Sequence, residues 1–141
     1  MGKILCATRG GEAAQRTQDA AIALAKERGD SLLFLFVADV HFLNHTEHPV
    51  RPDVVQEEMV HMGEFLLAMA QERAQQQGVP ASFVVRQGNL VEQLKAVAVE
   101  EGASLVVLGR PSQEGGLFRL EELEALAAEI QRETGVETRI L

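Results

Sequence analysis

The segment that most restricts the fold is the run SLLFLFVA at residues 31–38, in which every residue after Ser31 is apolar. A strand with one face in water alternates apolar and polar residues, whereas a strand covered on both faces does not. Strands of the second kind are typical of parallel sheets, because crossover helices cover both faces of such sheets. We therefore expect residues 31–38 to form a buried strand of a parallel sheet.

Short apolar runs alternate with helical patterns along the rest of the chain. Further strands are predicted at residues 3–8, 81–88, 104–109 and 136–141. The intervening helices are predicted over residues 12–28, from just after Asp53 to Gly78, from an Asn89 cap to Gly102, and over residues 120–133. This alternation predicts right-handed βαβ crossovers, and hence an α/β fold with a mainly parallel sheet and helices on both faces.

Composition limits the classes of function. A chain of 141 residues is about one domain on the usual length scale, so we expect a single domain over residues 1–141. The net charge of −8 and the lack of Trp and Tyr argue against binding to nucleic acid or to anionic membranes. No segment approaches the length that spans a bilayer. The single cysteine, Cys6, is expected to be a small core residue of a cytoplasmic protein.

The candidate ligand site lies at the carboxyl ends of the strands, because open α/β sheets bind ligands in the crevice where the strand order reverses. The loops that follow the predicted strands supply its residues. They are Thr8, Arg9, Gly10, Ala38, Gly88, Gly109, Arg110, Ser112, Gly115 and Gly116.

Three parts of the chain carry a family resemblance. They are KILCAT at residues 3–8, QGNLVEQLKAVAVEEGASLVVLG at residues 87–109, and the final strand at residues 136–141. Over its whole length the chain resembles the universal stress protein family, whose members are small cytoplasmic α/β proteins. The resemblance implies an open five-stranded parallel sheet in the order 3-2-1-4-5. This is a Rossmann-like fold of the adenine-nucleotide alpha hydrolase type.

The ATP-binding motif of that family is incomplete in this chain. Nucleotide-binding members carry GxxGx(9)G and then Ser or Thr after strand four. Here Gly109 matches the first glycine, but Ser112 replaces the second, and Glu122 with Leu123 replaces the final pair. A register shifted by one residue, which uses Gly115 and Gly116, does not restore the motif either. The Asp that members carry at the end of strand one is also absent, since Thr8 and Arg9 occupy that corner.

These departures decide the expected function. Glycines let backbone N–H groups approach phosphate, and a hydroxyl at the helix N-terminus adds a donor, whereas a carboxylate there repels the ligand. We expect a regulatory or protective binding module that is not an enzyme and whose standard ATP site is degenerate. The alternative is a switch that binds ATP or another nucleotide in the crevice after strands one and four. A nucleotide hydrolase is a weaker alternative, because no general base or metal pair is visible.

Three arginines follow predicted strands. Arg9 and Arg110 follow strands one and four, which are neighbours in the implied order, so the two side chains are placed to share an anionic small molecule with help from Gly10 and Gly11. Arg86 ends the third strand. The alternative is that all three are solvated or paired with carboxylates, which is common and contributes little.

Two further groups of residues have a functional and a structural interpretation. His41, His45 and His48 are spaced to share a metal if their segment is helical, but a histidine-rich loop is the simpler interpretation. Met59, Met62 and Met69 recur at helical spacing and are expected to pack in the core, with a partner surface as the alternative. No metal is assigned on this basis.

The final strand, VETRIL, predicts the mode of assembly. An edge strand leaves backbone N–H and C=O groups unpaired, and in the resembling family this edge pairs across a two-fold axis. We expect a homodimer through Val136 to Leu141, in which antiparallel pairing sets Glu137 of one strand against Arg139 of the other. The alternative is a short edge strand that its own charges protect.

Overall fold

The computed structural model describes residues 2–8, 12–39, 52–110 and 120–141. Strands and helices alternate along these residues without exception. In chain order they are β1 (Lys3–Ala7), α1 (Glu12–Arg28), β2 (Ser31–Ala38), α2 (Pro52–Gln76), β3 (Ala81–Gln87), α3 (Leu90–Glu100), β4 (Leu105–Leu108), α4 (Leu120–Thr134) and β5 (Glu137–Ile140). The predicted type and order of these elements are therefore confirmed.

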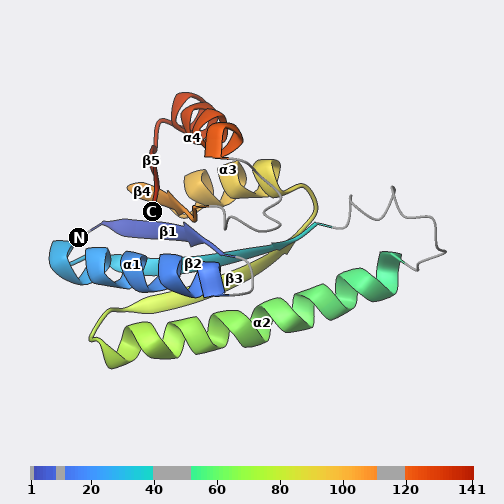
Figure 1. Ribbon diagram of the computed structural model, residues 1–141, viewed down its shortest axis with the longest axis horizontal. Helices are drawn as coiled ribbons and strands as arrows, with labels where there is room; N and C mark the ends of the chain where they lie inside the picture. Colours follow the sequence, from blue (N-terminus) through green and yellow to red (C-terminus); the bar gives the residue numbers. More distant parts are fainter. Residues whose placement is uncertain (1, 9–11, 40–51, 111–119) are drawn as a thin grey trace.

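The strands form one parallel sheet in the order β3-β2-β1-β4-β5 (Figure 1). β1 lies in the middle, where Cys6 is in register with Phe34 of β2 on one side and with Val107 of β4 on the other. The chain therefore builds outward from β1 in both directions, and the strand order reverses between β1 and β4. The strand order implied by the resemblance is confirmed.

Alternate residues of the inner strands enter two separate cores. One face of the sheet carries Ile4, Phe34 and Val107 and packs against α1 and α2. The other face carries Leu5 and Leu35 among others and packs against α3 and α4. Figure 1 shows the two helix pairs on opposite sides of the sheet. β2 is thus covered on both faces, as its continuous apolar sequence predicts.

The buried face of α2 differs from the predicted one. Leu67, Ala70 and Ala74 are fully buried, whereas Met62 is 49% exposed and Met69 48% exposed. The cause is the small size of the residues on the inner face, which lets the helix approach the sheet closely. The prediction that Met62 and Met69 pack in the core is therefore wrong, although Met59 does pack against it.

Helix ends follow the capping signals in the sequence. Asn89 accepts a hydrogen bond from the backbone N–H of Glu92 at 3.0 Å, as its predicted capping role requires. Gly29 follows α1 with a φ of 71°, and Gly78 follows α2 with a φ of 80°, conformations that favour glycine. Of the helices in the described ranges, none combines the length and apolar character needed to cross a bilayer.

Candidate functional site

The carboxyl ends of the strands bring the described candidate residues to one edge of the sheet. Ala38 and Gly88 lie side by side there, because the N–H of Gly88 donates to the Ala38 carbonyl at 3.1 Å. Thr8 continues β1, and Gly109 continues β4, at the point where the strand order reverses. The described candidates therefore form two pairs. Ala38 and Gly88 lie at the ends of β2 and β3, and Thr8 and Gly109 lie at the ends of β1 and β4.

Thr8 is buried and held from below by α1. Its side-chain oxygen accepts a hydrogen bond from Nε2 of Gln18 at 2.6 Å, and both residues are almost fully buried. The family's carboxylate position thus holds a neutral hydroxyl whose orientation depends on α1. A neutral group here lacks the charge that an Asp would present to the adenine side of a ligand.

Arg73 of α2 completes this polar contact. Its guanidinium donates to Oε1 of Gln18 at 2.6 Å and also lies 3.3 Å from Oδ1 of Asp19. The amide of Gln18 is therefore used at both ends, with Thr8 on one side and Arg73 on the other. Sequence reasoning missed this link, because Gln18 and Arg73 lie 55 positions apart and neither stands in a motif.

Packing alone explains why residue 109 is a glycine. A Cβ at this position would lie 2.7 Å from Oγ1 of Thr17, closer than side-chain atoms normally approach. Thr17 is itself buried on the inner face of α1. The first glycine of the motif is therefore required for the close approach of α1 to the end of β4.

The two described arginines of the site differ in their contacts. Arg86 forms an ion pair with Glu100 at 2.7 Å, which supports the structural interpretation for this residue. The backbone N–H of Arg110 donates to the carbonyl of Leu141 at 3.1 Å, so the residue extends the pairing of β4 with β5. Its side chain is exposed, and no hydrogen bond or ion pair with another described residue engages the guanidinium.

The N-termini of α3 and α4 are unfavourable places for an anion. Two amides in the first turn of α3 are occupied, since Asp39 accepts from the N–H of Leu90 at 3.1 Å and Asn89 accepts from that of Glu92. The first turn of α4 carries two exposed carboxylates, Glu121 and Glu122. Negative charge at a helix N-terminus stabilises the helix through its dipole and competes with an anionic ligand for the same place.

Several predicted residues lie outside the described part of the chain. They are the candidate ligand residues Arg9, Gly10, Ser112, Gly115 and Gly116, and the histidines His41, His45 and His48. The shared anion of Arg9 and Arg110 therefore stays a prediction. In the described ranges, no cluster of three or more His, Cys, Asp or Glu side chains is arranged to hold a metal ion.

Cys6 lies in the interior of the protein, in an environment that does not suit a nucleophile. It is fully buried in the middle of β1, and this burial raises the pKa of its thiol to about 12. The thiol is therefore neutral at physiological pH, when only a thiolate would react. The interpretation of Cys6 as a core residue agrees with this environment.

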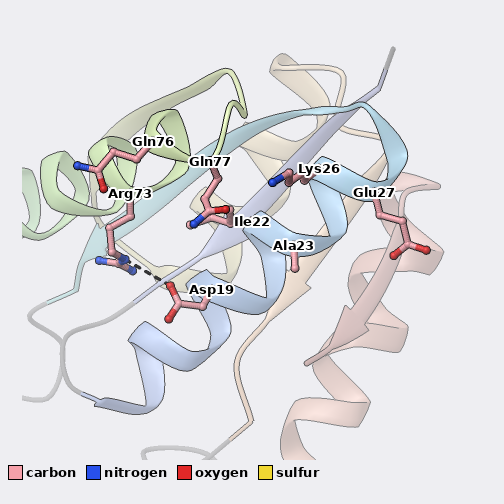
Figure 2. A pocket seen from close by; sticks show the side chains of 8 residues that line it. All are labelled: Asp19, Ile22, Ala23, Lys26, Glu27, Arg73, Gln76 and Gln77. Atoms are coloured by element: carbon pink, nitrogen blue, oxygen red, sulfur yellow. Dashed lines mark hydrogen bonds and ion pairs between the residues drawn. The ribbon is translucent and has the colours of Figure 1, made fainter.

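A concave feature lies between α1 and α2. It is an open groove of about 560 Å³, and its lining includes Asp19, Lys26, Glu27 and Arg73 (Figure 2). Figure 2 shows Arg73 turned toward Asp19, with which it forms its ion pair. The charges of the groove are mixed, and it lies on a face of the sheet rather than at the ends of the strands. Its lining therefore selects no particular class of ligand.

The sequence of this chain matches a known protein family. The sequence model of the Universal stress protein family matches residues 1–120 of this chain. A search of curated protein sequences gives no significant match.

Solved structures match over the whole chain. A protein of the universal stress protein family from Burkholderia pseudomallei superposes with a TM-score of 0.76 at 24% identity, covering 99% of this chain and 95% of that one. A universal stress protein in complex with cAMP gives 0.62 at 17% identity, covering 99% and 96%. A universal stress protein family member from Arabidopsis thaliana with AMP bound gives 0.65 at 12% identity, covering 100% and 91%. At these identities the structural likeness shows the fold alone.

Proposed function

Because this chain belongs to the universal stress protein family, we propose that it is a regulatory or protective binding module that does not hold ATP in the family's usual way. The observation that carries the proposal is the acidic first turn of α4, where Glu121 and Glu122 are exposed. Compared with the ATP-binding motif of the family, Glu122 and Leu123 stand where a glycine and a hydroxyl residue would contact phosphate. One helix N-terminus that would stabilise a triphosphate instead presents negative charge.

The N-terminus of α3 supports the same proposal. Phosphate sites use unoccupied backbone N–H groups at a helix N-terminus. At α3, Asp39 and Asn89 already occupy such groups. An anion would have to displace a side-chain carboxylate or amide that is linked to the chain, so this helix offers no ready replacement for the α4 site.

A nucleotide-binding switch is the second candidate. Two of the similar solved structures contain cAMP and AMP, and each ligand has one phosphate rather than three. A monophosphate needs fewer donors than a triphosphate, and the exposed guanidinium of Arg110 stands beside the crevice. In this version Arg110, together with Arg9, replaces the missing donors of the glycine loop.

Thermal unfolding with separate ligands distinguishes the two candidates. A ligand present at about a hundred times its dissociation constant stabilises the native state by about 2.7 kcal/mol. The binding module predicts no rise in melting temperature with millimolar ATP and magnesium, AMP or cAMP. The switch predicts a rise with AMP or cAMP that disappears in Arg110→Ala. A clear rise with ATP and magnesium in the unmodified protein would refute the degenerate site.

Removal of the carboxylates tests the physical cause. If Glu121 and Glu122 repel phosphate, then the double variant Glu121→Gln, Glu122→Gln should bind ATP more tightly than the unmodified chain. The matched control is Glu124→Gln, which removes an exposed charge from the second turn of the same helix. Equal ATP binding by all three proteins would remove the electrostatic explanation.

The remaining features of the proposal concern assembly and location. We propose that residues 1–141 act as one domain, since both cores share a single sheet. We propose a cytoplasmic protein without enzymatic activity, which fits a thiol that burial keeps neutral and a crevice with a hydroxyl at Thr8. The homodimer through β5 also belongs to this proposal. Val136 and Ile140 are only partly buried in the single chain and would gain cover from a partner.

A further inference from the structure

α2 exposes an apolar stripe on its outer face. Phe65 is 66% exposed, and Met62 and Met69 are each about half exposed. Their spacing of three and four residues places them on one side of a helix, within about 60° of one another around its axis. Val54, which is 43% exposed, extends the same line toward the start of α2. Single exposed apolar side chains are common in soluble proteins, but three within two turns of one helix form a patch.

The stripe lies opposite the face by which α2 packs on the sheet. The inner face is formed by Gly63, Leu67 and Ala70, all buried, and Phe65 points about 160° away from the centre of that face. Figure 1 shows α2 as an outer element beside β3, with its first turns extending past the ends of the strands. The stripe makes no contribution to the core, so its apolar character needs another explanation.

Acidic side chains lie beside the stripe on α2. Glu57, Glu58, Glu64 and Glu72 are all exposed on α2, and none of them forms a hydrogen bond or ion pair with another described residue. Arg73 is the only Lys or Arg of this helix, and its guanidinium is engaged by Gln18 and Asp19. Glu57 and Glu64 lie along one flank of the stripe, whereas Glu58 and Glu72 lie in line with it, before Met62 and after Met69. The surface is therefore apolar from Met62 to Met69 and negative along one flank and at both ends of this part.

We propose that the α2 stripe, defined as Val54, Met62, Phe65 and Met69, docks a basic amphipathic helix of another protein. The apolar side of such a helix would cover Phe65 and the two methionines, whose flexible side chains adapt to different partners. Its Lys and Arg residues would meet the glutamates along one flank and at the ends of the stripe. A second copy of this chain would bring acidic borders together, and an anionic membrane would be repelled in the same way. The inference does not depend on whether the crevice binds a nucleotide.

A model peptide tests the docking directly. The probe is a fluorescent synthetic helix of about 18 residues that carries leucines on one face and lysines on the other, which gives a length of about 27 Å. The control probe replaces every lysine with glutamate. Fluorescence anisotropy at physiological salt should show saturable binding of the lysine peptide with one peptide per chain, and no binding of the glutamate peptide. Absence of lysine-peptide binding would overturn the proposal.

Matched variants separate the stripe from the rest of the surface. Phe65→Ser with Met69→Ser should weaken peptide binding by about tenfold or more, because apolar anchors dominate such interfaces. The control is Val99→Ser on α3, which is 62% exposed and outside the stripe. Val99→Ser should leave binding unchanged. Equal effects of the two changes would contradict a localised site. Retained melting temperatures would show that all variants are folded.

Charge variants exclude simple attraction to an acidic protein. Glu64→Gln with Glu72→Gln should weaken binding several-fold, whereas Glu27→Gln with Glu124→Gln removes the same charge from α1 and α4 and should have little effect. Equal weakening would show that net charge alone attracts the peptide. Two further results would also overturn the proposal. One is dimerisation that Phe65→Ser abolishes, and the other is binding of the stripe to vesicles of anionic phospholipid in preference to the peptide.

Discussion

Gly109 and Thr17 approach so closely that a Cβ on the glycine would lie 2.7 Å from the threonine Oγ1. This contact joins the end of β4 to the inner face of α1, at the edge where a nucleotide would bind. Gly109→Ala should therefore destabilise the protein in the absence of any ligand, by about 1–3 kcal/mol. Chemical denaturation measures this difference.

The same pair allows a double-mutant cycle. Thr17→Ala removes the atoms that the new methyl group would meet, so Gly109→Ala should cost less in that background than in the unmodified protein. An additive double mutant would mean that the contact with Thr17 does not determine the need for glycine. The ligand loop would then be the remaining reason for Gly109.

Gly63 of α2 makes a similar close contact on the face of the sheet that α1 and α2 cover. A Cβ there would lie 2.8 Å from Cγ of Phe36 and nearer still to Cδ1. Alanine is favoured over glycine in a helix by about 1 kcal/mol, yet overpacking costs about 1–3 kcal/mol. Gly63→Ala should therefore destabilise the protein or leave it unchanged, whereas the exposed control Ala68→Gly should cost about 1 kcal/mol. Stabilisation by Gly63→Ala would show that Phe36 moves freely.

Arg73 and Arg86 offer a comparison between a buried polar link and a surface ion pair. Arg73→Leu would leave Oε1 of buried Gln18 without its donor and should cost about 1–3 kcal/mol. Arg86→Leu only breaks the pair with Glu100, whose side chain is half exposed, and should cost at most about 1 kcal/mol. Urea denaturation of both variants gives the two values. A similar cost for both would mean that solvent replaces Arg73 at Gln18.

Burial patterns explain why most of the fold could be predicted from the sequence. The continuous apolar run of β2 requires cover on both faces, and the stop signals at Gly29 and Gly78 are local backbone effects. Strand order is different, because periodicity does not determine which strands are neighbours. It followed from the family resemblance, and the sheet confirms it.

One wrong prediction and one missed contact both depend on how closely the helices pack. Apolar periodicity on α2 favoured Met62 and Met69 as core residues. The distance from α2 to the sheet is instead set by the small side chains at Gly63 and Ala70. An apolar pattern does not show that distance. The link from Thr8 through Gln18 to Arg73 was missed for the same reason. Neither glutamine nor arginine indicates a polar contact beneath a ligand crevice until α1 and α2 are placed side by side.

The Cys6 thiol should make the stability of the protein depend on alkaline pH. Burial raises its pKa from 9.0 to about 12, so folding favours the neutral thiol. This contribution is complete below pH 9.0, where the unfolded thiol is also neutral, and it is lost as the pH rises from 9.0 toward 12. The difference in unfolding free energy between the unmodified protein and Cys6→Ala should therefore be constant up to pH 8. Above pH 9.0 the unfolding free energy of the unmodified protein should fall relative to that of Cys6→Ala, by at most about 1.4 kcal/mol per pH unit.

Thiol labelling at pH 8 gives an independent check on Cys6. A reagent should reach the thiol only when β1 opens, because β1 is the central strand of the sheet. The labelling rate should therefore rise with added urea in proportion to the unfolded population. Rapid labelling of the native protein would contradict both the burial and the raised pKa.

The free edge of β5 leads to the prediction about assembly. Leu141 donates to the carbonyl of Leu108 at 2.9 Å and accepts from Arg110, so its backbone faces β4. Because backbone groups alternate along a strand, those of Ile140 and Thr138 face outward. The N–H of Thr138 is already taken by the side chain of Gln131 at 3.3 Å, which leaves Ile140 as the outward N–H for a partner strand.

A proline at residue 140 therefore tests the proposed dimer with little disturbance of the sheet. Proline removes the outward N–H and fixes φ near −65°, and the change also shortens the partly buried Ile140 side chain. Edge strands tolerate proline where the lost N–H faces solvent. Light scattering should show a dimer for the unmodified chain and a monomer for Ile140→Pro, with most of its thermal stability retained. The control is Arg139→Pro, whose lost N–H faces β4, so this variant should unfold at a lower temperature. A monomeric unmodified chain, or a dimer that survives Ile140→Pro, would leave the edge protected by the Gln131 contact and by the ion pair of Glu137 with Arg139 at 3.1 Å.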